Sequence, residues 1–113
     1  MAEESVAQGK KWPSYTMVDP RMRKIYFQFY QETYRSSAID RKTKELIALA
    51  LSVAARCDPC IGFHMQTLVK LGVTRQEIDE TLGVTTYMGG GPSLMYAASA
   101  IAAFDEFSRP RSA

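Results

Sequence analysis

Apolar residues recur at helical spacing along most of this 113-residue chain. The pattern first appears after Pro20, where positions three and four apart are apolar, and it predicts a helix from about 20 to 34. Asp19 is expected to cap this helix, with Pro20 as its first residue. Residues 1–18 carry little periodicity, so we expect them to form a flexible N-terminal arm.

Three further helices are predicted over the middle of the chain. Asp40 is expected to cap the second, whose second half, "LIALALSVAA", is apolar on every side and predicts a central, buried element. A third helix should begin within residues 57–60 and end at Gly72, because glycine favours the left-handed conformation that follows many helices. Thr74 and Glu77 form a capping box, which predicts the start of a fourth helix.

The sequence "GGGP" at 89–92 breaks the fourth helix and predicts a fifth that begins at Pro92 and continues over "SLMYAASAIAAFDEF". This last helix is rich in alanine. We expect its small-residue face to be built from Ala97, Ala98, Ala102 and their neighbours, which would permit close approach to another helix.

Together these elements predict an all-α bundle of about five helices, with residues 19–108 as a single domain and 109–113 as a frayed tail. The sequence contains no strand-like alternation and no repeat. Two alanine-rich helices give a chain of this size few means of burying its apolar surface alone. An oligomer and a compact monomer with packed alanine faces both remain open.

Charge and hydropathy exclude several classes of partner. The formal net charge is only +2, and basic residues are mixed with acidic ones, which argues against a nucleic-acid partner. The longest apolar run, 46–55, is about half of the roughly 20 residues that a membrane span needs, and the first residues lack the apolar run of a secretory signal. We therefore expect a soluble, cytoplasmic protein. In that compartment, close cysteines are more often redox-active or metal-binding than structural.

The segment "RCDPCIGFHMQ", residues 56–66, contains both cysteines and the only histidine of the chain. If Pro59 lies in the first turn of a helix, Cys57, Cys60 and His64 are three and four residues apart on one face. The positive end of the helix would favour a thiolate, and the imidazole would take or return its proton. Closing a disulfide between residues three apart would bend the first turn, which would keep the bridge reducible.

Two other interpretations of this cluster compete with redox chemistry. A zinc site would lack a fourth cysteine or histidine ligand, because the chain has no others. The second interpretation is purely structural, with two buried cysteines and a histidine whose hydrogen bonds are satisfied. It would be the default if the three residues were scattered along the chain, but they are clustered. No βαβ pattern surrounds the cysteines, so a thioredoxin fold is not expected. We favour a redox site that needs neither a metal nor a cofactor.

Glu45 opens the apolar run, twelve residues before Cys57. If the second helix packs beside the third, this carboxylate would point to the cysteine site and exchange protons with a thiol. Alternatively, it pairs with Arg41 one turn earlier on a solvated face. Spacing alone does not decide between the two arrangements.

The set E-x11-C-x2-C-x3-H, followed by "GGGP" and an alanine-rich helix, resembles the alkyl hydroperoxidase D (AhpD)-like core of the carboxymuconolactone decarboxylase superfamily. The resemblance covers roughly residues 20–107 and implies an all-helical fold that assembles as homotrimers or homohexamers. It also implies a thiol peroxidase cycle. In this cycle Cys60 would attack a hydroperoxide, and Cys57 would resolve the sulfenic acid as a disulfide. Glu45 and His64 would relay protons. The reductant would be a dithiol donor, either a lipoyl-bearing or a thioredoxin-like protein.

The chain departs from parts of this family. Some members carry a histidine between the cysteines, where this chain has Asp58 and Pro59, and some have a longer, duplicated helical body. The order of the cysteines can also be argued without the family. His64 is one turn from Cys60, which favours Cys60 as the nucleophile, whereas thioredoxin-like chemistry would use the more exposed Cys57.

The expected activity is therefore that of a thiol-dependent peroxidase or disulfide oxidoreductase. Decarboxylases of the superfamily lack the cysteine pair, which argues against their reaction. Two alternatives stay open. One is a redox-sensing or assembly protein that cycles its disulfide without turnover. The other is an enzyme acting on a small lactone acid, with His64 as base and Glu45 as acid.

Overall fold

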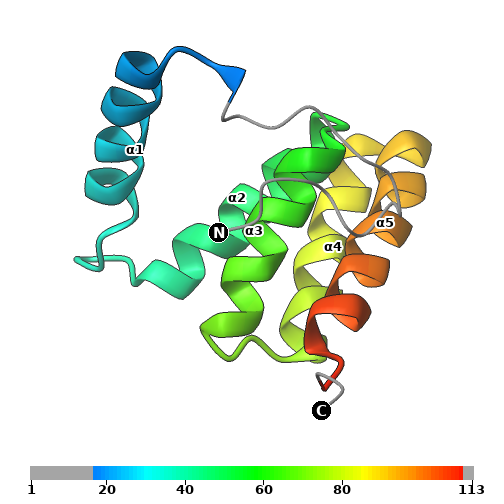
Figure 1. The fold of residues 1–113 in the computed structure, drawn as a ribbon. Helices are drawn as coiled ribbons and strands as arrows, with labels where there is room; N and C mark the ends of the chain where they lie inside the picture. Colours follow the sequence, from blue (N-terminus) through cyan, green and yellow to red (C-terminus); the bar gives the residue numbers. More distant parts are fainter. Residues whose placement is uncertain (1–16, 111–113) are drawn as a thin grey trace.

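The computed structural model describes residues 17–110, and these form five α-helices without any strand (Figure 1). The helices are α1 (Pro20–Tyr34), α2 (Arg41–Ala54), α3 (Asp58–Lys70), α4 (Arg75–Gly89) and α5 (Gly91–Ser108). This confirms the predicted all-α fold. Most of the predicted N-terminal arm, and residues 111–113 of the predicted tail, lie outside the described part of the chain. None of the five helices is long and apolar enough to cross a membrane.

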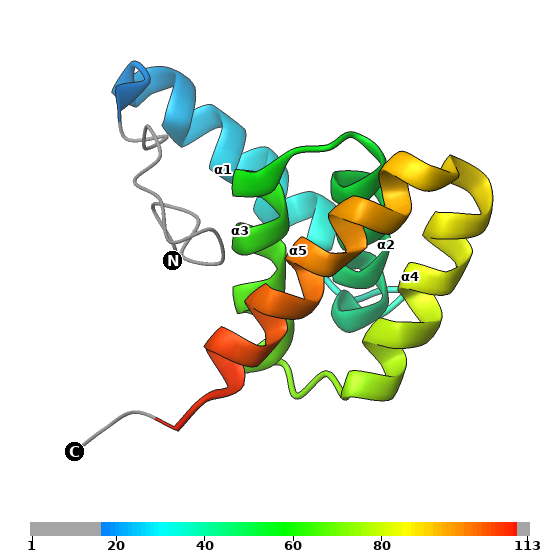
Figure 2. The same ribbon diagram turned by 90° about the vertical axis from the view of Figure 1, so that its right-hand side faces the viewer.

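Helices α2 to α5 pack side by side as a bundle, and α1 projects from it on one side (Figures 1 and 2). The position of α2 is central, as predicted, because it contacts each of the other four helices. Its burial is one-sided, however. Leu49 and Val53 are fully buried, whereas Leu51 is 64% exposed and Ile47 is 47% exposed. The prediction of a buried helix therefore holds for one side of α2 and not for the side that carries Ile47 and Leu51.

The core lies between α2, α3, α4 and α5, and its largest apolar side chains are Leu49, Ile61, Met65, Leu68 and Ile78. Small residues of α5 close the remaining side. The buried residues of α5 are Ser93, Ala97, Ala100 and Ala103.

The predicted small-residue face of α5 is partly wrong, because Ala98 and Ala102 are exposed. Each residue advances about 100° around a helix. Ala98 and Ala102 therefore lie on a different side of α5 from Ala100 and Ala103, which face the core.

The ends of the helices follow the capping residues seen in the sequence. The side chain of Asp40 accepts a hydrogen bond from the Thr43 N–H at 2.8 Å. Hydrogen bonding with the Thr43 side chain, and then with this N–H, holds the pKa of Asp40 below its ordinary value. Thr74 and Glu77 form the predicted capping box at the start of α4. Gly72 follows α3 with a φ of 81°, as expected of a residue after a helix C-terminus.

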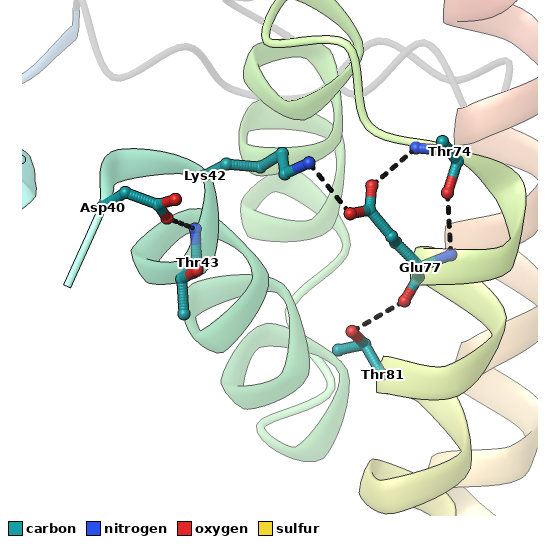
Figure 3. Close-up of polar contacts among 6 residues, drawn as sticks. All are labelled: Asp40, Lys42, Thr43, Thr74, Glu77 and Thr81. Carbon is teal, nitrogen blue, oxygen red and sulfur yellow. Dashed lines mark hydrogen bonds and ion pairs between the residues drawn. The ribbon is translucent and has the colours of Figure 1, made fainter.

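Glu77 also connects α4 to α2, as Figure 3 shows. One carboxylate oxygen accepts from the Thr74 N–H at 2.9 Å, and the other lies 2.8 Å from the Lys42 ammonium of α2. The hydrogen bond from Lys42 lowers the pKa of Glu77, and the same bond raises the pKa of Lys42. This ion pair fixes the first turn of α2 against α4, one turn before Glu45.

Candidate active site

Cys57 is the N-cap of α3, and its sulfur forms a disulfide with Cys60 in the first turn. Asp58 and Pro59 are the first two helical residues, as the proline position predicted. The backbone at Cys57 is extended rather than helical, and the Cα atoms of the two cysteines are 5.3 Å apart. The pairing therefore uses the residue just outside the helix, and the expected bend within the first turn is not needed.

The helix N-terminus acts directly on one of the two sulfurs. The Cys60 N–H donates a hydrogen bond to the Cys57 sulfur, with 3.3 Å between nitrogen and sulfur. An amide donor at a helix N-terminus favours negative charge on the atom that it faces. When the disulfide is reduced, this arrangement favours a thiolate at Cys57. Both cysteines are partly exposed, so a second molecule can reach the pair.

A tight backbone turn delivers Cys57 from the end of α2 to the start of α3. The Cys57 N–H donates to the Ser52 carbonyl and the Arg56 N–H to the Val53 carbonyl, both at 3.0 Å. These two bonds form a Schellman motif, in which the residue at the position of Arg56 is usually glycine. Arg56 adopts a φ of 58° there. The connection between α2 and α3 therefore consists only of residues 55–57.

Glu45 of α2 reaches the imidazole of His64 on α3, although the two residues are 19 positions apart. The distance between Glu45 Oε1 and His64 Nδ1 is 2.7 Å, and the glutamate side chain is fully buried. A carboxylate can only accept hydrogen bonds. An ionised Glu45 therefore places the ring proton on Nδ1 and leaves Nε2 free. Of the two arrangements left open by the sequence, the structure has the one in which Glu45 points into the bundle.

Two tyrosines of α1 complete this site, and the sequence analysis missed their role. The Tyr30 hydroxyl donates to Glu45 Oε2 at 2.5 Å, and the Tyr34 ring stacks on the His64 imidazole with centroids 5.9 Å apart. Arg41 donates to the Tyr30 oxygen at 3.3 Å instead of pairing with Glu45 directly. The only signal in the sequence was that the two tyrosines are four residues apart on one helix face.

Burial and the neighbouring carboxylate keep both phenols protonated. The pKa of Tyr30 is raised, first by burial and then by its hydrogen bond to Glu45, while the bond from Arg41 opposes this shift. The pKa of Tyr34 is raised by burial and by the negative charge of Glu45. Both side chains therefore act as neutral groups at physiological pH, and Tyr30 has one proton to donate.

The site can thus join two sulfurs and move a proton. His64 is one helical turn after Cys60, so its ring lies on the face of α3 that carries the cysteines. Behind the ring are a buried carboxylate and two phenols. In the described part of the chain, no group of three or more His, Cys, Asp or Glu side chains is arranged to hold a metal ion.

Comparisons with known proteins agree on one family. Residues 20–103 match the model of the carboxymuconolactone decarboxylase family. A crystal structure of apo-lpg0406, a protein of this family from Legionella pneumophila, is 58% identical, with a TM-score of 0.78 over 80% of each chain. A Thermotoga maritima member, considered for a role in the antioxidative response, is 31% identical. Its TM-score is 0.71 over 79% of this chain and 76% of its own.

A relative with a named activity matches a shorter stretch. The alkyl hydroperoxide reductase AhpD of Coxiella burnetii is 35% identical over 46% of this chain and 29% of its own length. The chain spans 63% and 66% of the length of two other curated relatives that it matches.

Proposed function

The chain belongs to the carboxymuconolactone decarboxylase family and has its AhpD-like core, and on that premise we propose that it is a thiol-dependent peroxidase. It would reduce hydroperoxides through Cys57 and Cys60, at the expense of a dithiol donor. The observation that carries the proposal is the placement of two joined sulfurs one helical turn from a histidine that is bound to a buried glutamate.

The first half of the proposed cycle consumes the peroxide. The Cys60 thiolate attacks one peroxide oxygen, the O–O bond breaks, and the products are a sulfenic acid on Cys60 and an alcohol. The Cys57 thiolate then attacks the sulfenic sulfur, which forms the disulfide and releases water once a proton has been supplied. The amide hydrogen bond to the Cys57 sulfur favours the thiolate that this second attack requires.

The second half returns the enzyme to its dithiol form. A dithiol donor attacks the disulfide, passes through a mixed disulfide, and leaves as its own disulfide, so that two electrons and two protons reach Cys57 and Cys60. Lipoyl-bearing and thioredoxin-like proteins are the donors that the AhpD resemblance suggests. Partial exposure of both cysteines supports access of such a donor.

Glu45 and His64 are proposed to manage the protons of this cycle. His64 Nε2 takes the proton of the Cys60 thiol and later returns it to the departing alkoxide, so that an alcohol leaves. The imidazolium formed between these steps is stabilised by the carboxylate at Nδ1. No cofactor takes part in any step, since the two sulfurs carry the electrons.

The proposal extends to the assembly and the location of the protein. Side chains such as Tyr87 and Met88 are 86% and 78% exposed, and α1 carries further exposed apolar residues. Apolar surface of this kind supports a homo-oligomer, which we propose to be a trimer or hexamer. A disulfide that must be reduced in every cycle supports a reducing compartment such as the cytoplasm.

The test is mass spectrometry of the reduced protein after hydrogen peroxide, with and without reduced lipoamide. The wild type should lose two hydrogens, and lipoamide should restore them over many turnovers. Cys57→Ser should trap one oxygen on Cys60, and Cys60→Ser should show neither change. Equal turnover of hydroperoxide by both variants and the wild type would contradict the proposal. A single stoichiometric oxidation without turnover would indicate a redox sensor instead.

A further inference from the structure

The carboxylate of Glu45 is bound at both oxygens by residues from different helices. Tyr30 of α1 donates to Oε2, and His64 of α3 lies against Oε1. Because Glu45 is fully buried, these two partners replace the water that would otherwise solvate its charge. The proton transfers proposed above involve only the contact between Glu45 and His64, and the Tyr30 hydroxyl takes no part in them.

We propose that Tyr30 is a positioning residue: its hydroxyl holds Glu45 as a hydrogen-bond acceptor, and Glu45 thereby holds His64 in the tautomer whose proton is on Nδ1. Nε2 is then free to take a thiol proton. The effect of this arrangement on turnover rests on the proposed peroxidase function, whereas the tautomer can be observed without it.

Arg41 gives the hydrogen-bond chain its direction. The guanidinium has donors only, so the Tyr30 oxygen must act as the acceptor in their 3.3 Å contact. The single phenolic proton is therefore available for Glu45, at 2.5 Å. Donors aligned in this way polarise one another and strengthen the bond at the end of the chain. Burial raises the pKa of Tyr30, which keeps that proton in place.

Aromatic rings hold the imidazole in the orientation that this chain requires. Tyr34 stacks on one face of His64, and the Phe63 ring meets the imidazole edge-on with centroids 5.1 Å apart. Tyr30 itself packs against Phe63 at 5.7 Å. The helix α1, none of whose residues is fully buried, is thus attached to the site through Tyr30 and Tyr34.

Removal of the Tyr30 hydroxyl has a defined consequence. In Tyr30→Phe, Oε2 of Glu45 would remain buried without a donor, and this penalises the ionised form. The titratable and charged groups around this carboxylate are Tyr30 and Tyr34 of α1, Arg41 of α2 and His64 of α3. A protonated Glu45 would donate to Nδ1, and the ring proton would move to Nε2. The free nitrogen would then face the glutamate instead of the thiol.

The test uses the fact that the chain has a single histidine. Long-range proton–nitrogen NMR spectra of nitrogen-15-labelled protein report which ring nitrogen carries the proton, without ambiguity of assignment. The wild type, at a pH where the imidazole is neutral, should show the proton on Nδ1. Tyr30→Phe should show a several-fold larger fraction with the proton on Nε2. Tyr26→Phe, an exposed tyrosine on the same helix, should match the wild type and serves as the control.

Either of two results would overturn the proposal. One is a wild-type ring protonated on Nε2, which can be observed even if Tyr30→Phe fails to fold. The other is a folded Tyr30→Phe variant whose tautomer is unchanged. Turnover supplies a separate readout: Tyr30→Phe should lower kcat by about tenfold or more and leave KM for hydroperoxide unchanged. If the wild type shows no turnover at all, the proposed function fails while the tautomer result still decides the role of Tyr30.

Discussion

Glu45 and His64 meet at 2.7 Å between Oε1 and Nδ1, with the glutamate fully buried and the histidine half a helix away from the start of α3. This contact joins α2 to the helix that carries both cysteines. It gives the imidazole, which follows Cys60 by one helical turn, a fixed hydrogen-bond acceptor at Nδ1. The contact is therefore the first feature to test by substitution.

Glu45→Gln should keep the fold and lose most of the activity. The amide nitrogen would donate to Nδ1 and its oxygen would still accept from Tyr30, so the hydrogen bonds persist while the ring proton moves to Nε2. We expect a loss in kcat of about 100-fold, the usual scale of a positioned proton-transfer group. Steady-state hydroperoxide turnover checks this. Glu32→Gln, on the exposed side of α1, is the matched control. Wild-type kcat in Glu45→Gln would remove the proton relay from the mechanism.

Gly89→Ala should destabilise the turn between α4 and α5. A Cβ at this position would lie 1.9 Å from Ser93 Oγ and 2.8 Å from Ser93 Cβ, and Ser93 is buried. We expect a loss of about 1–3 kcal/mol in the free energy of unfolding, as for other overpacked sites. Gly83→Ala, in the same helix and with open space around it, should instead gain about 0.5–1 kcal/mol. Urea denaturation measures the free energy of unfolding of both variants. Equal changes in the two variants would contradict the close approach of Gly89 to Ser93.

Arg56→Gly should stabilise the oxidised protein. Arg56 holds a φ of 58°, a conformation that costs a residue with a Cβ about 1–2 kcal/mol. Glycine removes this cost but adds freedom to the unfolded chain, so we expect a net gain of about 0.5–1 kcal/mol. Denaturation of Arg56→Gly and Arg56→Ala separates the backbone effect from loss of the side chain. A gain in the alanine variant as large as in the glycine variant would refute this explanation.

The ion pair of Lys42 and Glu77 should contribute to stability in a pH-dependent manner. The pKa of Glu77 is lowered in the folded state from the ordinary value of 4.5, mainly by its hydrogen bond with Lys42. The unfolded chain therefore binds a proton first as the pH falls. The contribution is complete above pH 4.5 and is lost as the pH falls through the lowered folded value. Glu77→Gln should reduce the slope of unfolding free energy against pH in this acid range. An unchanged slope would show that Asp19 and Asp40, whose pKa values are also lowered, account for it.

Exposed apolar side chains near the turn between α4 and α5 should be covered in solution if the proposed homo-oligomer forms. Tyr87, Met88 and Met95 are 86%, 78% and 70% exposed in the single chain. A charge introduced by Met88→Glu should weaken an interface at this surface. Sedimentation velocity over a range of concentrations measures the effect, with Glu80→Gln on the exposed side of α4 as the control. A wild type that sediments as a monomer at all concentrations would contradict the assembly.

The sequence by itself determined the ends of the helices and the make-up of the sulfur cluster. Asp40, Thr74 and Gly72 act through hydrogen bonds and backbone conformations that span only a few residues, so their roles can be inferred locally. The same holds for Cys57 and Cys60, because two residues three positions apart at the start of a helix have few possible relative positions.

Tertiary structure decided which side of each helix is covered and what stands behind His64. Glu45 could pair with Arg41 in its own helix or point to a neighbouring helix. Only the packing of α2 against α3 selected the second arrangement, in which Glu45 is buried against His64. Tyr30 reaches the site across 15 residues and a change of helix, which helical periodicity does not encode. Apolar periodicity shows which face of a helix can be buried, but it does not show which other helix buries that face. That choice depends on how separate helices cross.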